Sequence, residues 1–363
     1  MRAERVKQLA EQCGFDLAGI APAEPTVESL FYPEWLARGY AGEMEYLKGR
    51  RGAMRADPKS LLPTAKSLIC AGLVYNTPDP YSNQVEPRDA GWVSRYAWGN
   101  DYHGVIRGRL HALAGMIREE AGPFDCRIAV DTSPLLERAY AHRAGLGWIG
   151  KNTCLINQEA GSWVLLGEIL TSLELEPDER APFRCGTCTR CIDACPTDAL
   201  VPTGDPEGPA YALDSRLCIS YWTIELRGAI PENGRSRMGA HVFGCDICQD
   251  VCPWNRRAAS TEDPAFQPRN MLPDLEDLAA MTEEEFNRRF SGSPIERPRY
   301  RGFLRNVAVA MGNSGNPKFR AILEQMASNA DPLVREHALW ALARLSNRGE
   351  AAARIDRPEA NHP

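Results

Sequence analysis

The chain has 363 residues, a formal net charge of −6, and 44% hydrophobic and 25% charged residues. This length suits two or three domains, and the composition excludes a disordered or low-complexity chain. The acidic balance argues against general coating of nucleic acid, although a local basic patch can still bind phosphates. The N-terminus lacks the apolar core of a signal peptide, and no apolar stretch has the length of a membrane span. These features predict a cytoplasmic protein without a membrane segment.

Residues 1–176 alternate helical and strand patterns, which predicts a mixed α/β domain. Residues 67–75 form an apolar run of strand length, and residues 103–120 place apolar side chains on one helical face. Residues 126–131 alternate as a half-buried strand does, and residues 163–170 predict a further strand. The order of the strands in the sheet does not follow from these patterns.

Two motifs in this domain are similar to cofactor loops without matching them. The run Gly145–Asn152 satisfies G-x-G-x-x-G, but nucleotide loops follow a strand, and here a short helix precedes it, predicted to be capped by Ser133 and to begin at Pro134. We therefore interpret the run as a glycine-rich turn. Asp101-Tyr-His103 lacks the glycine of the D-x-H-x-x-G loop that places a histidine on cobalt, because Ile106 stands there. His103 is predicted to cap or pack.

Residues 177–255 contain eight of the twelve cysteines. The run from Cys185 to Pro196 has the C-x-x-C-x-x-C-x-x-x-C-P spacing of bacterial ferredoxins. The run from Cys245 to Pro253 lacks one cysteine of this pattern, and Cys218 can supply it. In two-cluster ferredoxins the fourth cysteine ligates the other cluster. The pattern therefore predicts two 4Fe-4S clusters, one on Cys185, Cys188, Cys191 and Cys252 and the other on Cys195, Cys218, Cys245 and Cys248.

Structural zinc is the alternative for these cysteines, because it also uses paired C-x-x-C motifs. Zinc sites do not need the third cysteine or the C-x-x-x-C-P ending, so the pattern favours iron and sulfur. A disulfide framework is not expected in the cytoplasm. The segment has little apolar periodicity and is expected to fold on its metal. The other cysteines lack ligand spacing and are predicted to be core residues: Cys13, Cys70, Cys126 and Cys154.

From residue 256 the composition shifts to a proline-containing linker and then to helical signals. Residues 316–329 and 332–345 predict two helices whose sequence is similar to a HEAT-type repeat. Only one to two repeats are visible, so we expect them to pack against the rest of the chain. The predicted domains are therefore residues 1–176, 177–255 and 256–363.

Five motifs together resemble the epoxyqueuosine reductase family across nearly the whole chain. They are residues 131–134, 143–152, 185–196, 218–228 and 244–255. The resemblance implies an α+β architecture with a cobalamin-binding α/β domain, a ferredoxin-like module with two 4Fe-4S clusters, and a HEAT-like α-helical domain that binds tRNA. It implies reduction of epoxyqueuosine to queuosine at the wobble position of tRNA, the last step of queuosine biosynthesis.

The implied reaction consumes two electrons and two protons, and a cofactor must supply the electrons. The resemblance makes Asp131 the proton donor and a cobalamin contact. To donate near pH 7, Asp131 needs a pKa well above about 3.9, which burial against an apolar corrin would favour and a helix N-terminus would oppose. The alternative is that Asp131 only caps the following helix.

The resemblance also implies the cofactor contacts and the partners. Cobalamin is expected to bind base-off, with no protein ligand on cobalt. An external low-potential donor is expected to supply electrons to a monomeric enzyme. The cofactor contacts carried over are Arg55, Ser94, Asp131, Leu155, Leu166, Ser220 and Asp246.

A basic segment provides the expected tRNA surface. Arginine forks suit phosphates, and Phe290, Tyr300 and Phe303 lie between the arginines as candidate stacking surfaces. The alternative is a solvated helix face paired with Glu283–Glu285. The expected tRNA-binding residues are Arg227, Arg288, Arg289, Arg297, Arg299, Arg301 and Arg305.

Two other functions remain open at this point. A cobalamin-dependent reductive dehalogenase would use the same two cofactors, but it has no evident use for the arginines. A ferredoxin-type electron carrier would need neither Asp131 nor the long segment ahead of the clusters. Bound cobalamin separates the carrier from both enzymes, and RNA binding separates the two enzymes.

Overall fold

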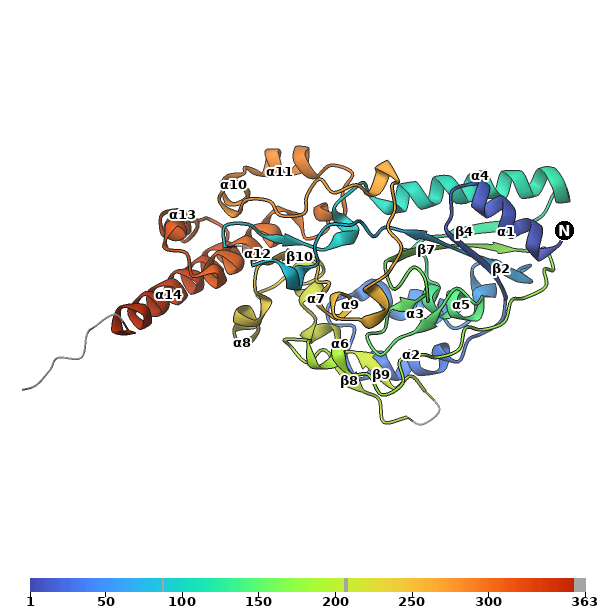
Figure 1. The fold of residues 1–363 in the computed structure, drawn as a ribbon, viewed down its shortest axis with the longest axis horizontal. Coiled ribbons are helices and arrows are strands. Elements are labelled where there is room, and N and C mark those ends of the chain that lie inside the picture. Colours follow the sequence, from blue (N-terminus) through green and yellow to red (C-terminus); the bar gives the residue numbers. More distant parts are fainter. Residues whose placement is uncertain (87, 206–207, 356–363) are drawn as a thin grey trace, which may run out of the picture. The chain divides into compact units, whose positions relative to one another are not determined.

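The computed structural model describes residues 1–86, 88–205 and 208–355, with side chains described as far as residue 346. The described residues form two compact units, each assembled from separate chain segments (Figure 1). The first unit contains Met1–Asp79, Gly99–Arg216 and Ile247–Pro268, and the second contains Pro80–Trp98, Leu217–Asp246 and the described residues from Arg269 onward. The three sequence-based domains do not coincide with these units, and their boundaries remain a prediction.

A four-stranded sheet with the order β1-β2-β7-β4 is the centre of the first unit. Its strands are β1 (Leu17–Pro22), β2 (Ser67–Val74), β7 (Val164–Thr171) and β4 (Cys126–Ala129). All three pairings are antiparallel. Every residue of β2 is buried, as its continuous apolar run predicts. The strands predicted at residues 67–75, 126–131 and 163–170 are confirmed to within a few residues.

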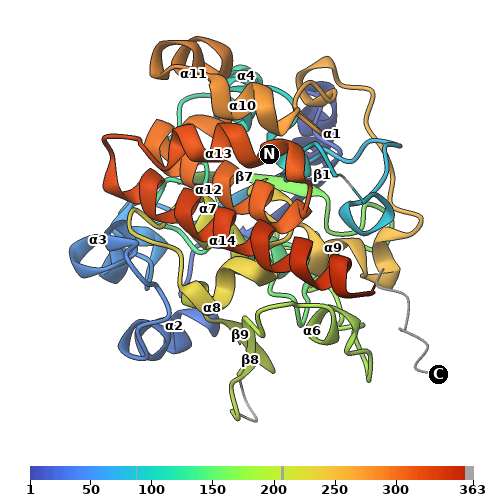
Figure 2. The same cartoon turned by 90° about the vertical axis from the view of Figure 1, so that its left-hand side faces the viewer.

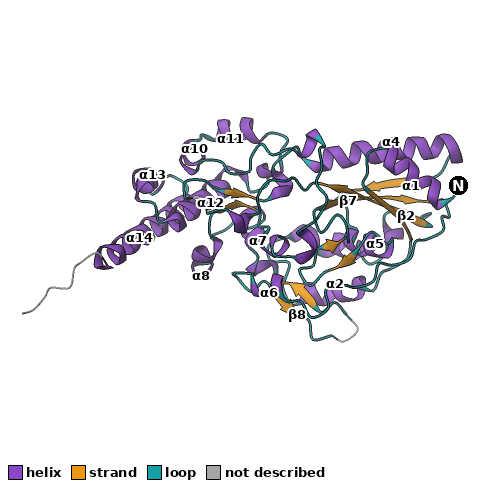
Figure 3. Cartoon of the chain, viewed as in Figure 1, coloured by secondary structure: helices purple, strands orange, loops and turns teal. Residues whose placement is uncertain are grey.

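Helices α4 (Tyr102–Ala121) and α5 (Glu137–Arg143) pack against strands of this sheet. The predicted apolar face of α4 is confirmed, because Ile106, Leu110, Leu113 and Ile117 are fully buried. A Cβ atom added to Gly167 in β7 would lie 2.5 Å from Cγ2 of Ile106, so the glycine permits the close approach of α4. Figure 3 shows α4 as the long helix that runs beside β7.

The rest of the first unit consists of short elements around the sheet. Strands β5 and β6 form an antiparallel hairpin in which Trp148 pairs with Ile156, so the glycine-rich turn predicted there is confirmed. Strands β8 and β9 form a second hairpin. The bounds are α1 (Ala3–Gln12), α2 (Glu28–Ala37), α3 (Gly49–Met54), β5 (Trp148–Ile149), β6 (Leu155–Ile156), α6 (Arg190–Asp193), β8 (Leu200–Pro202), β9 (Tyr211–Leu213) and α9 (Ile247–Asp250).

The predicted start of α5 at Pro134 is wrong. The helix begins three residues later, at Glu137, and Ser133 does not cap it. The reason is local: Asp131 has a φ of 42°, and its backbone N–H donates to the Glu137 carboxylate instead of entering a helical turn. The predicted stop is confirmed, because α5 ends at Arg143 and Gly145 follows with a φ of 78°.

Helices dominate the second unit. Its core joins aromatic residues from several elements, including Trp92, Phe243, Phe286 and Phe303. Helix α14 packs against α12 and α13 in Figure 2. The bounds are β3 (Trp92–Val93), α7 (Ile219–Ile224), α8 (Glu232–Arg235), β10 (His241–Phe243), α10 (Leu275–Ala280), α11 (Glu283–Phe290), α12 (Arg299–Ser314), α13 (Arg320–Met326) and α14 (Pro332–Ile355).

The two C-terminal helices predicted from the sequence are present with different lengths. Helix α13 is shorter than predicted, because a 3₁₀ turn at Pro317–Phe319 precedes it, and α14 continues beyond Leu345. Their likeness to a HEAT repeat remains a prediction. No helix in the described part of the chain has the length and hydropathy needed to span a membrane.

Candidate functional site

Asp131 lies at the end of β4 and forms a hydrogen-bonded chain with two residues at the start of α4. Its Oδ2 atom is 3.1 Å from Nε2 of His103, and Nδ1 of His103 is 2.7 Å from Oδ1 of Asp101. The Asp131 side chain is 53% exposed, so a substrate can reach it. The turn that presents it has a left-handed backbone, which aspartate tolerates better than most residues. The fold thus brings a carboxyl group and an imidazole together at an accessible strand end.

Protonation of His103 is favoured by this geometry. Burial alone would lower its pKa, but the hydrogen bonds to Asp101 and Asp131 outweigh burial and raise the pKa to about 9. The imidazole therefore carries a proton next to Asp131 at neutral pH. The prediction that His103 only caps or packs did not include this contact. The Asp101-Tyr-His103 triplet was visible in the sequence, but only the fold places it beside Asp131.

Two further carboxyl groups lie near Asp131, and the motifs did not identify either of them. Glu137 accepts the backbone N–H of Asp131, and burial, followed by repulsion from Asp131, raises its pKa to about 8. Glu168 in β7 is fully buried, and neither carboxyl oxygen has a hydrogen-bond partner among the described residues. Burial and then the charges of Glu137 and Asp131 raise the pKa of Glu168 well above its usual range. Burial thus favours the protonated form of both carboxyl groups.

The four cysteines predicted to hold one cluster all belong to the first unit. Burial, followed by the charges of neighbouring cysteine sulfurs, raises the pKa of Cys191 to about 11. Those neighbours are Cys252, Cys185 and Cys188. The fold therefore gathers the cysteines that the ferredoxin spacing assigns to a single cluster. Helix α6, which contains Cys191, packs against α9, which contains Cys248.

The other predicted set is divided between the two units. Cys195 and Cys248 belong to the first unit, and Cys218 and Cys245 belong to the second. The backbone N–H of Ala199 donates to the Cys195 sulfur at 3.3 Å, a contact that suits a thiolate ligand. No group of three or more His, Cys, Asp or Glu residues in the described ranges is spaced to hold a single metal ion.

Three of the expected cofactor contacts, besides Asp131, lie in the first unit. Leu155 and Leu166 belong to one buried apolar cluster that also contains Ala129, at the end of β4. Arg55 is buried at the end of α3, and its guanidinium donates to the Arg51 carbonyl at 2.9 Å. The first unit thus combines a buried apolar cluster that reaches the end of β4 with a buried cation at the end of α3.

The remaining expected contacts lie in the second unit. The Ser94 hydroxyl donates to Oδ1 of Asp246 at 2.5 Å, and the backbone N–H of Arg95 donates to Oδ2 at 2.7 Å. Burial raises the pKa of Asp246, although these two hydrogen bonds act in the opposite direction. Ser220 is half-buried in α7. Ser94 and Asp246, which are far apart in the sequence, therefore form one buried polar pair.

Most of the predicted tRNA-binding arginines are exposed side chains of the second unit. Two of them form ion pairs: Arg297 with Glu225 at 3.0 Å, and Arg301 with Asp331 at 3.4 Å. Surface pairs of this kind are weak and can exchange for a phosphate. The exposed arginines are Arg227, Arg288, Arg289, Arg297, Arg299 and Arg301.

Arg305 is a correction to this set. It is 0% exposed, and its guanidinium donates to the carbonyl oxygens of Trp222, Leu226 and Gly228. A phosphate cannot reach the Arg305 guanidinium, because the side chain lies on the buried face of α12. Phe290 and Phe303 are also buried, in the aromatic core around Phe286, so they cannot stack on bases.

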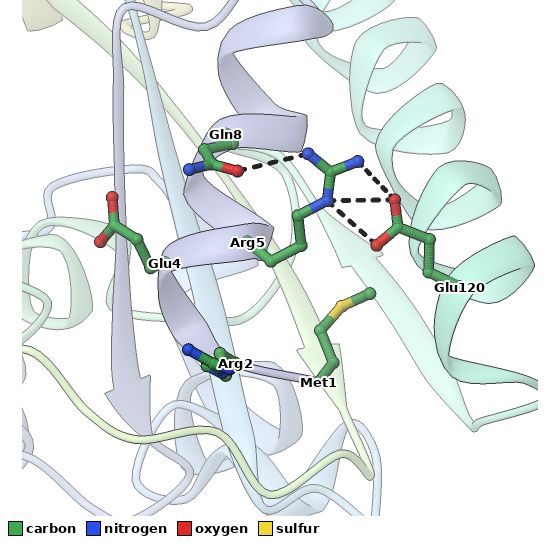
Figure 4. Close-up of a pocket in the computed structure, with 6 residues that line it drawn as sticks. All are labelled: Met1, Arg2, Glu4, Arg5, Gln8 and Glu120. Carbon is green, nitrogen blue, oxygen red and sulfur yellow. Dashed lines mark hydrogen bonds and ion pairs between the residues drawn. The ribbon is translucent and has the colours of Figure 1, made fainter.

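A surface hollow near the N-terminus is unrelated to these groups. Arg5 in α1 forms a two-pronged ion pair with Glu120 in α4 there, and Gln8 accepts a further hydrogen bond from Arg5 (Figure 4). None of the lining residues is a cysteine or a predicted site residue. The hollow is lined by Met1, Arg2, Glu4, Arg5, Gln8 and Glu120.

The sequence matches two family models. Residues 55–132 match the model described as Epoxyqueuosine reductase QueG, DUF1730, and residues 184–255 match the 4Fe-4S double cluster binding domain. The epoxyqueuosine reductase of Xanthomonas campestris pv. campestris is 44% identical, over 94% of this chain and 95% of that protein. The chain belongs to the epoxyqueuosine reductase family. The Escherichia coli epoxyqueuosine reductase is 40% identical, over 96% of this chain and 91% of its own length.

Solved epoxyqueuosine reductase structures share this fold. One, in complex with a tRNA-Tyr epoxyqueuosine-modified stem loop, is 29% identical with a TM-score of 0.84, covering 98% of this chain and 94% of that one. Another, from Bacillus subtilis, has the loop of its catalytic aspartate swung out of the active site; it is 28% identical with a TM-score of 0.82, covering 99% and 95%. The chain is thus a mixed α/β oxidoreductase with a 4Fe-4S double-cluster domain.

Proposed function

We propose that this chain reduces epoxyqueuosine to queuosine at the wobble position of tRNA. One observation carries the proposal: Asp131 and His103 form an accessible proton-donating pair in a chain that also has the cysteine pattern of a double cluster. Family membership supplies the substrate class, and the relative bound to an epoxyqueuosine-modified stem loop supports tRNA as the substrate.

The electrons enter through the cysteine-rich segment. We infer that Cys185, Cys188, Cys191 and Cys252 hold one 4Fe-4S cluster, and that the other cluster is held by Cys195, Cys218, Cys245 and Cys248. An external low-potential donor supplies the electrons singly. The two-electron reduction of the substrate therefore requires two successive transfers.

The residues of the first unit fit an apolar macrocycle such as cobalamin. Leu155 and Leu166 offer backbone and apolar contacts, and Arg55 offers a buried cation. Ser94, Ser220 and Asp246 are the contacts proposed in the second unit. Both ring nitrogens of His103 are already hydrogen-bonded to carboxyl groups, so this histidine would not be available as a ligand to a bound cobalamin. When bound and reduced, cobalamin supplies a strong nucleophile or one-electron donor toward the epoxide.

The protons come from groups around Asp131. Opening the epoxide leaves an alkoxide, which takes up a proton. The charged His103, whose pKa is raised to about 9, supplies that proton through Asp131, which passes a proton to the alkoxide as it receives one from Nε2 of His103. Glu137 holds the backbone N–H of Asp131 and fixes the turn. The turn that contains Asp131 is the proposed counterpart of the catalytic loop that is swung out of the active site in the Bacillus subtilis relative.

The exposed arginines of the second unit are the proposed contact surface for the tRNA backbone. Six guanidinium groups remain in this set after removal of Arg305, and their forks suit phosphate oxygens. The C-terminal helices resemble a HEAT repeat, which agrees with a helical module that binds RNA. A cytoplasmic, monomeric enzyme fits this substrate, and both properties remain part of the proposal.

Anaerobic turnover tests the proposal. Cluster-reconstituted protein is incubated with cobalamin, a strong reductant and epoxyqueuosine-bearing tRNA, and the nucleosides are analysed by mass spectrometry. Loss of one oxygen that depends on cobalamin is the expected result. Intact clusters and bound cobalamin without conversion would instead assign the chain to another cobalamin reductase.

A further inference from the structure

Apart from Leu155, a proposed cobalamin contact at the start of β6, the glycine-rich hairpin of β5 and β6 has no role in the chemistry described above. A Cβ atom on Gly147 would lie 2.3 Å from the Ile156 carbonyl oxygen, and one on Gly150 would lie 2.4 Å from Cδ1 of Ile156. The glycines therefore allow the two short strands to close on each other. Their spacing is explained by hairpin packing, without a nucleotide.

The hairpin presents three polar side chains, and each donates hydrogen bonds to a cysteine-bearing segment. Trp148 reaches a cysteine sulfur itself, whereas Lys151 and Asn152 reach backbone carbonyl groups. The bonds run from Trp148 Nε1 to Cys185 Sγ at 3.5 Å, from Lys151 Nζ to the carbonyls of Gly186 at 2.8 Å and Cys188 at 3.0 Å, and from Asn152 Nδ2 to the Cys248 carbonyl at 3.4 Å.

The Trp148 contact lies in a dry environment. Trp148 is 1% exposed and packs edge to face with Trp254, with ring centroids 4.9 Å apart and an interplanar angle of 75°. Ile156 and Cys252 belong to the same buried cluster. Hydrogen bonds act more strongly where water is excluded, so the indole N–H has a larger effect on the Cys185 sulfur than it would have in water.

We propose that the hairpin tunes the reduction potential of the cluster on Cys185, Cys188, Cys191 and Cys252. Reduction adds one electron from the external low-potential donor, with no bond broken and no proton moved. The added negative charge is stabilised by the N–H donor on the Cys185 sulfur and by the ammonium of Lys151. The hairpin therefore makes this cluster easier to reduce. This inference rests on the proposed cysteine assignment.

The Trp148→Phe variant tests the tuning, because phenylalanine keeps an aromatic ring and removes the N–H. The full chain is reconstituted with iron and sulfide, and its clusters are followed by EPR during a redox titration. We expect the midpoint potential of the cluster on Cys185, Cys188, Cys191 and Cys252 to fall. The midpoint potential of the other cluster should stay unchanged. At a fixed solution potential near its midpoint, the ratio of reduced to oxidised cluster should fall about three- to tenfold, the effect of one net hydrogen bond.

The Trp254→Phe variant is the matched control. Trp254 belongs to the same aromatic pair, but its indole makes no hydrogen bond to a cysteine sulfur within the described residues, so its removal should leave both potentials in place. Lys151→Met should lower the potential of the same cluster, as Trp148→Phe does, whereas Lys151→Arg should keep most of the wild-type potential because the cation is retained.

The outcomes separate this inference from the proposed function. Full iron content with wild-type potentials in Trp148→Phe and Lys151→Met overturns the tuning role. Equal iron loss in Trp148→Phe and Trp254→Phe, with an unshifted potential in Lys151→Met, also overturns it, because the hairpin is then only a structural support. A wild-type protein that takes up no cluster contradicts the cysteine assignment itself.

Discussion

Asp131 combines an accessible carboxyl group with an unusual backbone. Its φ of 42° lies in the left-handed region, where non-glycine residues are uncommon and are often found at functional sites. The hydrogen bond from its backbone N–H to Glu137 holds this conformation. The side chain consequently points to His103 instead of capping α5, which begins only at Glu137.

The Asp131→Asn variant should lose at least about 100-fold in single-turnover rate, because the amide cannot protonate the alkoxide. Cluster content and cobalamin binding should remain, since the substitution preserves shape. Asp125→Asn, at the opposite end of β4, is the matched control and should keep its activity. Wild-type turnover by Asp131→Asn with bound cobalamin would remove Asp131 from the donor role.

Both activity and stability should decrease as the pH rises into the alkaline range, because His103 then loses its proton. Its folded pKa of about 9 exceeds the ordinary value of 6.5, so the ionised pair stabilises the fold fully below pH 6.5 and is lost as the pH rises through about 9. The contribution is on the order of 1–3 kcal/mol. Urea unfolding and turnover measured across this range should show the loss.

The His103→Gln variant should remove this pH dependence and lower turnover, because glutamine can hydrogen-bond to Asp131 but cannot return a proton. His111→Gln, on the exposed face of the same helix, should behave like the wild type. A persisting decline in stability between pH 6.5 and 9 in His103→Gln would show that another group titrates there.

At the scale of elements, α12 organises the second unit through two buried polar residues. Arg305 donates to three carbonyl groups of the segment from Trp222 to Gly228, and Asn306 donates to the carbonyls of Thr223 and Val242. A buried guanidinium is tolerated because its donors are satisfied. The chain that follows Cys218 is therefore anchored to α12, and this element contact connects a predicted cluster ligand segment to the helical core.

The Arg305→Met variant should destabilise the second unit by roughly 2–5 kcal/mol, because three carbonyl groups lose their donor inside the core. The midpoint of urea unfolding, followed by tryptophan fluorescence, measures the change. Arg288→Met removes an exposed arginine and should shift the midpoint by less than about 0.5 kcal/mol. Similar midpoints for the two variants would contradict the structural role of Arg305.

At the scale of the whole molecule, this protein has a negative net charge, yet its proposed substrate, tRNA, is a polyanion. The net charge of −6 repels RNA at long range, so affinity has to come from local guanidinium groups. The exposed arginines of the second unit provide such groups, whereas the buried Arg305 does not. Binding that relies on phosphate contacts weakens as salt increases, because counterions compete.

Replacement of Arg288 and Arg289 by glutamine should weaken binding of an epoxyqueuosine-bearing stem loop. The slope of log Kd against the logarithm of salt concentration should fall by about one to two, since two phosphate contacts are removed. Fluorescence anisotropy at several salt concentrations measures both effects. Lys59→Gln in the first unit serves as a control that removes an exposed cation elsewhere. An unchanged salt slope in the arginine variant would return these residues to the role of a solvated helix face.

The sequence alone determined the features whose signals are local. Cysteine spacing predicts a double cluster because a C-x-x-C-x-x-C run brings three thiolates of one cubane together within a few residues. The apolar run of β2 and the periodic face of α4 likewise predict buried elements. Five ordered motifs were specific enough to indicate the family, which the comparisons confirm.

Only the tertiary structure decided which distant residues meet. Asp131 and His103 are 28 positions apart, and their contact depends on β4 ending beside the start of α4. Arg305 belongs to the same basic segment as the exposed arginines. It is nevertheless buried, because it lies on the inner face of α12, where its guanidinium donates to carbonyl groups that include that of Trp222. Charge and composition fix what a side chain can do, but its solvent exposure and its partners are set by long-range packing.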